Sequence, residues 1–109
     1  MTNYVFIESR DPFESRDARF VVDTATALKL GDNEVTVFLV QNGVLASRNN
    51  AAGSHLPQMA KAGITILADD FSLCERGIQP AEMTAGVRRS NIDILVDLLV
   101  RENTKAIWH

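Results

Sequence analysis

The residue of this sequence best suited to covalent chemistry is Cys74, the single cysteine among 109 residues. A lone thiol cannot form a disulfide within the chain, but its thiolate is a nucleophile. We expect a short helix to begin a few residues before Cys74, and Arg76 follows it closely. Both features favour a thiolate, whereas Glu75 opposes it. Cys74 is therefore the candidate catalytic residue.

Cys74 also has a purely structural interpretation. Phe71 precedes it by three positions, so on a helix the two side chains would share one face. A free cysteine beside an aromatic ring is most often a small buried hydrophobic residue. We favour burial against Phe71 and keep the reactive thiol as the alternative.

Polar residues that directly follow the expected strands form the second set of candidates. In an open parallel sheet, ligands bind at the carboxyl ends of the strands, where such residues converge. Turns and helix caps select the same residue types, so no single one of them is diagnostic. Arg76, which is close to the cysteine in the sequence, is added to this set. The candidate binding residues are therefore Ser9, Arg10, Asn42, Gly43, Asp69, Asp70 and Arg76. Further positions at this edge are Glu8, Gln41, Trp108, His109 and the loop of residues 45–54.

Several familiar sites do not occur in the sequence. It contains no glycine-rich dinucleotide or phosphate loop and no nucleophile elbow. Asp69 and Asp70 are neighbours, which do not face each other on a helix, so a strand end and a helix cap explain them better than an acid–base pair. One cysteine and the histidines at 55 and 109 lack metal-binding spacing. We expect no metal and no cofactor.

The composition is that of one ordinary globular domain over residues 1–109. Apolar residues make up 46% and charged residues 23% of the chain, with a net charge of −3. An acidic chain is a poor partner for nucleic acid. No apolar run approaches the roughly 20 residues that cross a bilayer, and no secretory signal is expected. A lone cysteine fits the reducing cytoplasm, which is the expected location.

Short apolar runs predict the strands that must position these candidates. They lie at residues 4–7, 34–40, 64–68 and 105–108, and a short fifth strand is expected near residues 85–87. Runs of this kind, without alternation, are typical of strands buried on both faces.

Helices are expected between these strands. The first begins at Asp11 or one turn later at Ser15, with Pro12 and Glu14 in its first turn, and ends at Gly31. Its apolar face carries Val21, Ala25 and Leu28. Further helices are expected at residues 54–62, from Asp69 or Asp70 to Arg76, and near residues 80–83. The last is expected to have Ser90 as its cap and to bury Ile92, Leu95, Val96 and Leu99. Strands that alternate with helices predict a parallel α/β sheet covered on both sides.

Three segments, taken in this order, resemble the DsrE/DsrF/DsrH-like sulfur-relay family. They are VFLVQNGV at residues 37–44, ADDFSLCERGI at residues 68–78 and KAIWH at residues 105–109. With length and element order, the similarity extends over nearly the whole chain. The resemblance implies a flavodoxin-like three-layer α/β sandwich with a mainly parallel sheet of about five strands. It also implies homo-oligomers, either trimers or hexamers, for which Phe13, Met83 and Trp108 are candidate exposed apolar contacts.

Active members of this family carry sulfur as a persulfide on one cysteine, between a sulfur-donor and a sulfur-acceptor protein. Counted back from the Arg-Gly pair, the family's carrier position falls at or near Asp69, and a related branch has it near Ser72. Cys74 coincides with neither position. Two functions therefore remain open: a sulfurtransferase-like carrier that uses Cys74, and a non-catalytic oligomeric subunit or small-ligand-binding protein.

Overall fold

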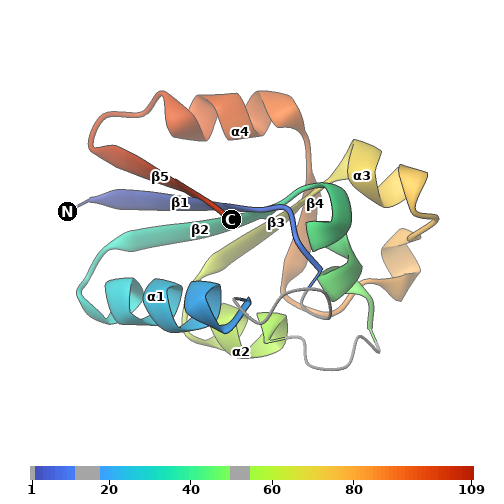
Figure 1. The fold of residues 1–109 in the computed structure, drawn as a ribbon, viewed down its shortest axis with the longest axis horizontal. Helices are drawn as coiled ribbons and strands as arrows, with labels where there is room; N and C mark the ends of the chain where they lie inside the picture. Colours follow the sequence, from blue (N-terminus) through green and yellow to red (C-terminus); the bar gives the residue numbers. More distant parts are fainter. Residues whose placement is uncertain (1, 12–17, 50–54) are drawn as a thin grey trace.

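The fold is built on a single five-stranded parallel sheet (Figure 1). A computed structural model describes residues 2–11, 18–49 and 55–109. The strand order is β4-β3-β2-β1-β5. The strands are β1 (Asn3–Glu8), β2 (Glu34–Leu39), β3 (Thr65–Asp69), β4 (Val87–Ser90) and β5 (Thr104–Trp108). The predicted mainly parallel sheet of about five strands is confirmed.

Helices cover the two faces of the sheet unequally (Figure 1). One face packs against α1 (Ala18–Leu30) and α2 (Leu56–Lys61), and the other against α4 (Ile92–Leu99). The shorter α3 (Asp70–Glu75) begins where β3 ends. Two 3-10 helices, η1 (Gln41–Ser47) and η2 (Pro80–Glu82), follow β2 and α3. This three-layer α/β arrangement confirms the predicted fold class.

The unequal cover gives two apolar clusters of different size. Alternate residues of each strand point to opposite faces, so Phe6 joins the cluster beneath α1 and α2 while Val5 and Ile7 lie under α4. The larger cluster holds most of the buried side chains of the described residues, including Val37, Leu39, Ile66, Val21, Ala25, Leu56, Met59 and Leu73. The smaller one consists of Val5, Ile7, Phe38, Val40 and Leu95. The α4 side is therefore a thin core.

The last helix differs from its prediction. Its N-cap is Asn91, whose side chain accepts a hydrogen bond from the Ile94 backbone N–H at 3.0 Å, and not Ser90, which ends β4. Only Leu95 of the predicted buried face is fully buried, because Ile92 and Val96 are each 50% exposed. The apolar stripe of this helix is wider than the part of it that packs on the sheet, where Leu95 contacts the smaller cluster.

The strand expected near residues 85–87 lies too early, because β4 runs from Val87 to Ser90. The remaining boundaries agree with the sequence, apart from those outside the described residues. Asp69 caps α3, and Gly31, Gly63 and Gly77 follow the ends of helices. Several predictions lie outside the described residues. They are Pro12 and Glu14 as the first turn of the first helix, its alternative start at Ser15, the exposure of Phe13, and the start of the second helix at Ser54. Over the part of the chain that is described, no helix has the length and apolar character needed to cross a bilayer.

Candidate functional site

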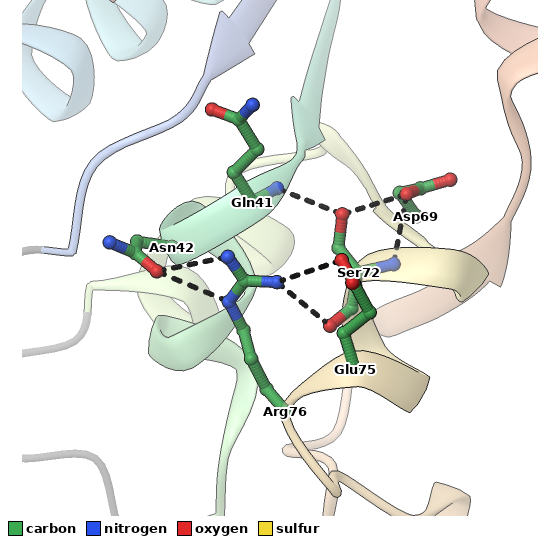
Figure 2. A network of polar contacts seen from close by, with 6 residues as sticks. All are labelled: Gln41, Asn42, Asp69, Ser72, Glu75 and Arg76. Atoms are coloured by element: carbon green, nitrogen blue, oxygen red, sulfur yellow. Dashed lines mark hydrogen bonds and ion pairs between the residues drawn. The ribbon is translucent and has the colours of Figure 1, made fainter.

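The end of β3 is tied to the end of β2 by a buried hydrogen-bond network (Figure 2). Asp69 Oδ2 accepts from the Ser72 backbone N–H at 3.0 Å and from the Ser72 hydroxyl at 2.7 Å. The same hydroxyl oxygen accepts the Gln41 backbone N–H at 2.9 Å. Gln41 has a φ of 50°, an uncommon value for a residue with a side chain. Ser72 therefore joins the cap of α3 to a strained turn after β2.

Arg76 forms a second bridge between the same two chain segments (Figure 2). Its Nε and Nη2 donate to Asn42 Oδ1 at 3.2 and 3.0 Å, and its Nη1 donates to the Ser72 carbonyl at 3.3 Å. Nη1 also lies 3.8 Å from a carboxylate oxygen of Glu75. Arg76 and Asn42, two of the predicted binding residues, thus hold α3 in place against η1.

A groove of about 390 Å³ opens at the carboxyl ends of β1, β2 and β3. Its polar lining residues are Gln41, Asp69, Ser72 and Glu75. Its apolar lining residues are Ile7, Val40, Phe71, Ile92, Leu95 and Trp108. The volume is in the range of small-molecule sites, and the position is the one that the parallel-sheet rule predicts.

Cys74 is exposed, so the expectation that it is buried against Phe71 is wrong. The cause is the orientation of α3, which buries Ser72 and Leu73 and leaves Phe71 and Cys74 on the solvent side. Phe71, on the far side of the helix, is 68% exposed. Cys74 is not among the described residues that line the groove, whereas its neighbour Glu75 is. The thiol is therefore accessible beside the groove and outside it.

A separate cluster lies where β1 and β5 end. His109 Nδ1 is 2.9 Å from both carboxylate oxygens of Glu8, and the Arg10 backbone N–H donates to Glu8 Oε1 at 3.1 Å. Both the Ser9 backbone N–H and its hydroxyl donate to the His109 carbonyl, at 2.8 and 3.0 Å. The His109 ring stacks on Phe20 with centroids 6.2 Å apart. The predicted Ser9 and Arg10 thus contact His109 and Glu8, at the ends of β5 and β1.

The two remaining predicted residues have structural surroundings of their own. A Cβ on Gly43 would lie 2.1 Å from the Glu8 carbonyl oxygen, so glycine is required for η1 to approach β1. Asp70 forms an ion pair with Arg89 on β4. Among all the predicted binding residues, the groove lining includes only Asp69.

Comparison with known proteins places the chain in a family. The sequence profile of the DsrE/DsrF-like family matches residues 2–104. The chain belongs to the DsrE/DsrF-like family. Among curated proteins, no sequence matches it.

Two solved structures share the DsrE-like fold over their full length. The ychN protein of E. coli superposes with a TM-score of 0.86 and 16% identity, and each chain covers 100% of the other. MTH1491 of Methanobacterium thermoautotrophicum, described as a protein of unknown function, has a TM-score of 0.82 and 16% identity, again with 100% coverage of both chains. At this identity the likeness concerns the fold.

Several residues of the site were not candidates in the sequence. The role of the Ser72 backbone could have been predicted. Ser72 lies three positions after Asp69, and a capping aspartate accepts a hydrogen bond from the backbone N–H at that position. Phe71 and Ile92 were assigned to buried positions, which concealed their place in the groove wall. The contact of His109 with Glu8 joins residues 101 positions apart, so no local pattern predicts it.

Proposed function

We propose that this DsrE-like chain is a sulfur-relay protein that carries sulfane sulfur as a persulfide on Cys74. The observation that supports it is the exposure of the single thiol of the chain on α3. A carrier must present its sulfur to two different proteins in turn, which a buried cysteine cannot do. We place this relay in the reducing cytoplasm, where a free thiol persists.

The transfer step is a thiolate exchange at sulfur. The Cys74 thiolate attacks the outer sulfur of a donor persulfide, the donor's S–S bond breaks, and the donor cysteine leaves as a thiolate. A new S–S bond on Cys74 Sγ completes the step, so one disulfide-type bond replaces another and no outside oxidant is needed. The reverse exchange, with the thiolate of an acceptor protein, discharges the carrier.

The surroundings of Cys74 hold the thiol in a fixed position for sulfur transfer to a partner protein. Arg76 ties the end of α3 to Asn42, and Asp69 caps its start, so the short helix is held at both ends. A thiol on a helix fixed in this way meets a partner in one orientation. Since Arg76 is already bound to Asn42 and to the Ser72 carbonyl, we assign it a positioning role.

The test is the intact mass of the full chain after incubation with a persulfide donor and removal of the donor. We expect a gain of about 32 Da that a reductant reverses. Cys74→Ser should show no gain. A wild-type protein that gains nothing, or a Cys74→Ser variant that gains the same mass, refutes the proposal.

A matched control separates a dedicated carrier from an incidental exposed thiol. Ala81 is exposed on η2, so the double variant Cys74→Ser, Ala81→Cys moves the single thiol to another accessible location. Both proteins should react with a small alkylating reagent, but only the wild type should pass labelled sulfur on to an acceptor protein efficiently. Equal transfer by the double variant would show that the position of the thiol on α3 contributes nothing to sulfur transfer.

A second candidate function is the binding of a small ligand in the groove without covalent chemistry. It is favoured by Asp69, which occupies the carrier position implied by the family resemblance and lines the groove, while Cys74 does not. The emission of Trp108, the single tryptophan and a lining residue, would report such a ligand. Under this alternative, Cys74→Ser binds the ligand as the wild type does and neither protein gains mass.

A further inference from the structure

The groove at the carboxyl ends of β1, β2 and β3 contains a buried carboxylate with no cation beside it. Asp69 is 5% exposed and lines the groove. Its Oδ2 accepts both hydrogen bonds from Ser72, and Figure 2 shows the other oxygen pointing away from Ser72. Among the described residues, none forms a hydrogen bond or an ion pair with that oxygen, Oδ1. A buried aspartate is rare unless it is paired, because its charge has lost most of its water. Asp69 Oδ1 is therefore an unused acceptor at the groove.

The nearby guanidinium of Arg76 does not supply the missing positive charge. Two of its nitrogens donate to Asn42, and over the described residues no Lys, Arg or His side chain lines the groove. The second carboxylate of the lining, Glu75, is 56% exposed and lies 3.8 Å from Arg76 Nη1, so water and this contact already offset its charge. The uncompensated negative charge of the groove is thus concentrated at Asp69.

The rest of the groove lining is largely apolar and partly aromatic. Ile7, Val40 and Leu95 are buried aliphatic side chains at 6%, 8% and 7% exposure. Phe71 and Trp108 expose most of their rings, and an aromatic ring attracts a cation over its face, tryptophan most strongly. One groove therefore offers aliphatic contacts for an apolar group, and aromatic rings and a carboxylate for a positive charge.

We propose that the groove binds a small organic cation, in which an ammonium group on an apolar body donates to Asp69 Oδ1. This inference rests on the second candidate function, ligand binding in the groove, and names the class of ligand. The volume of about 390 Å³ suits a small molecule. An ammonium forms charge-assisted hydrogen bonds with a carboxylate, which are stronger than neutral ones. A metal ion fits less well, because the part of the chain that is described has no group of three or more acidic, His or Cys side chains that could hold one.

The test uses three compounds that share one apolar body and differ in charge: phenylpropylamine, phenylpropanol and phenylpropionate. At about pH 7 the amine is a cation, the alcohol is neutral and the carboxylate is an anion. Binding to the full chain is measured by calorimetry and by the emission of Trp108, the single tryptophan, which lines the groove. We expect the amine to bind with a dissociation constant of about 1 mM or below, at least about 10-fold more tightly than the alcohol. The carboxylate should bind more weakly than either.

Asp69→Asn tests the assigned carboxylate. Asparagine is also a favourable helix cap, so this variant keeps one oxygen for Ser72 and replaces the other with an amide NH₂. Its affinity for the amine should fall about 10- to 100-fold, and its affinity for the alcohol should change by less than about 3-fold. A purely structural role of Asp69 would change both affinities together.

Asp70→Asn is the matched control. It removes the same charge one residue away, where Asp70 pairs with Arg89 and is not among the described residues that line the groove. Both affinities should stay as in the wild type. Should Asp69→Asn fail to fold by circular dichroism, the ranking of the three compounds by the wild type decides.

Two wild-type results would overturn the inference. Equal affinity for the three compounds overturns it and leaves the groove as a ligand site, whereas no binding of any of them at about 10 mM overturns the second candidate function as well. A folded Asp69→Asn variant that binds the amine as the wild type does, or an equal loss in Asp70→Asn, also overturns the inference. Persulfide loading of Cys74 has no bearing on these results.

Discussion

Replacement of Ser72 by alanine tests whether the buried network at the rim holds the site together. The change leaves the backbone of α3 untouched but removes the hydroxyl that donates to Asp69 at 2.7 Å and accepts from the Gln41 N–H at 2.9 Å. A net hydrogen bond is worth about 0.5–1.5 kcal/mol, and one to a charged group about 1.5–3 kcal/mol. We therefore expect the free energy of unfolding to fall by about 2–4 kcal/mol.

Urea unfolding followed by circular dichroism measures this loss. With a slope of about 2 kcal/mol per M, the middle of the range for small proteins, the midpoint should fall by about 1–2 M. Ser9→Ala is the matched control, because it removes a single partly buried hydrogen bond to the His109 carbonyl and should cost about 1 kcal/mol or less. A Ser72→Ala variant within 0.5 kcal/mol or so of the wild type would refute the network's structural role.

Three further substitutions test other parts of the site by the same unfolding assay. Gly43→Ala should cost more than about 3 kcal/mol or prevent folding, since its Cβ would lie 2.1 Å from the Glu8 carbonyl oxygen. Gly77→Ala should cost only about 1 kcal/mol, because an added Cβ would meet no atom within 4 Å and only the φ of 68° is unfavourable for alanine. Equal losses at the two glycines would contradict the close approach of Gly43 to Glu8. His109→Ala should cost about 1–3 kcal/mol by leaving the buried Glu8 carboxylate without its ring partner, and an unchanged midpoint would argue against that contact.

β1, β2 and β3 were predictable because strands buried on both faces have short continuous apolar runs. The run at residues 105–108 also predicted β5, although none of the residues of this edge strand is buried. β4 was the exception. Its sequence, Val87 to Ser90, has one apolar residue, and at the edge of the sheet it buries little, so the expected strand near residues 85–87 lies too early.

The candidate site was predictable only in its location. The rule that ligands bind at strand carboxyl ends correctly indicated where the groove opens. Cap chemistry left Asp69 and Asp70 as alternatives, and the structure has Asp69 as the cap. The exposure of Cys74 was not predictable, because a helix of 6 residues is too short for spacing alone to reveal its buried side. Contacts such as Arg76 with Asn42 join residues 34 positions apart and depend on the tertiary fold.

The exposed side of α4 could not be predicted from the apolar character of its residues. Ile92 and Val96 have the apolar character of buried residues, and the prediction placed them in the core of one chain. Both are 50% exposed instead. Met83, expected as an exposed contact, instead packs partly buried against the larger cluster, whereas Trp108 is exposed as expected.

The claim that Cys74 carries sulfur is tested most directly by the intact mass of the full-length protein after exposure to a persulfide donor. We predict a gain of about 32 Da that maps to Cys74, is reversed by reductant and is absent from Cys74→Ser. An unchanged mass for wild-type protein whose thiol still reacts with an alkylating reagent would contradict the claim.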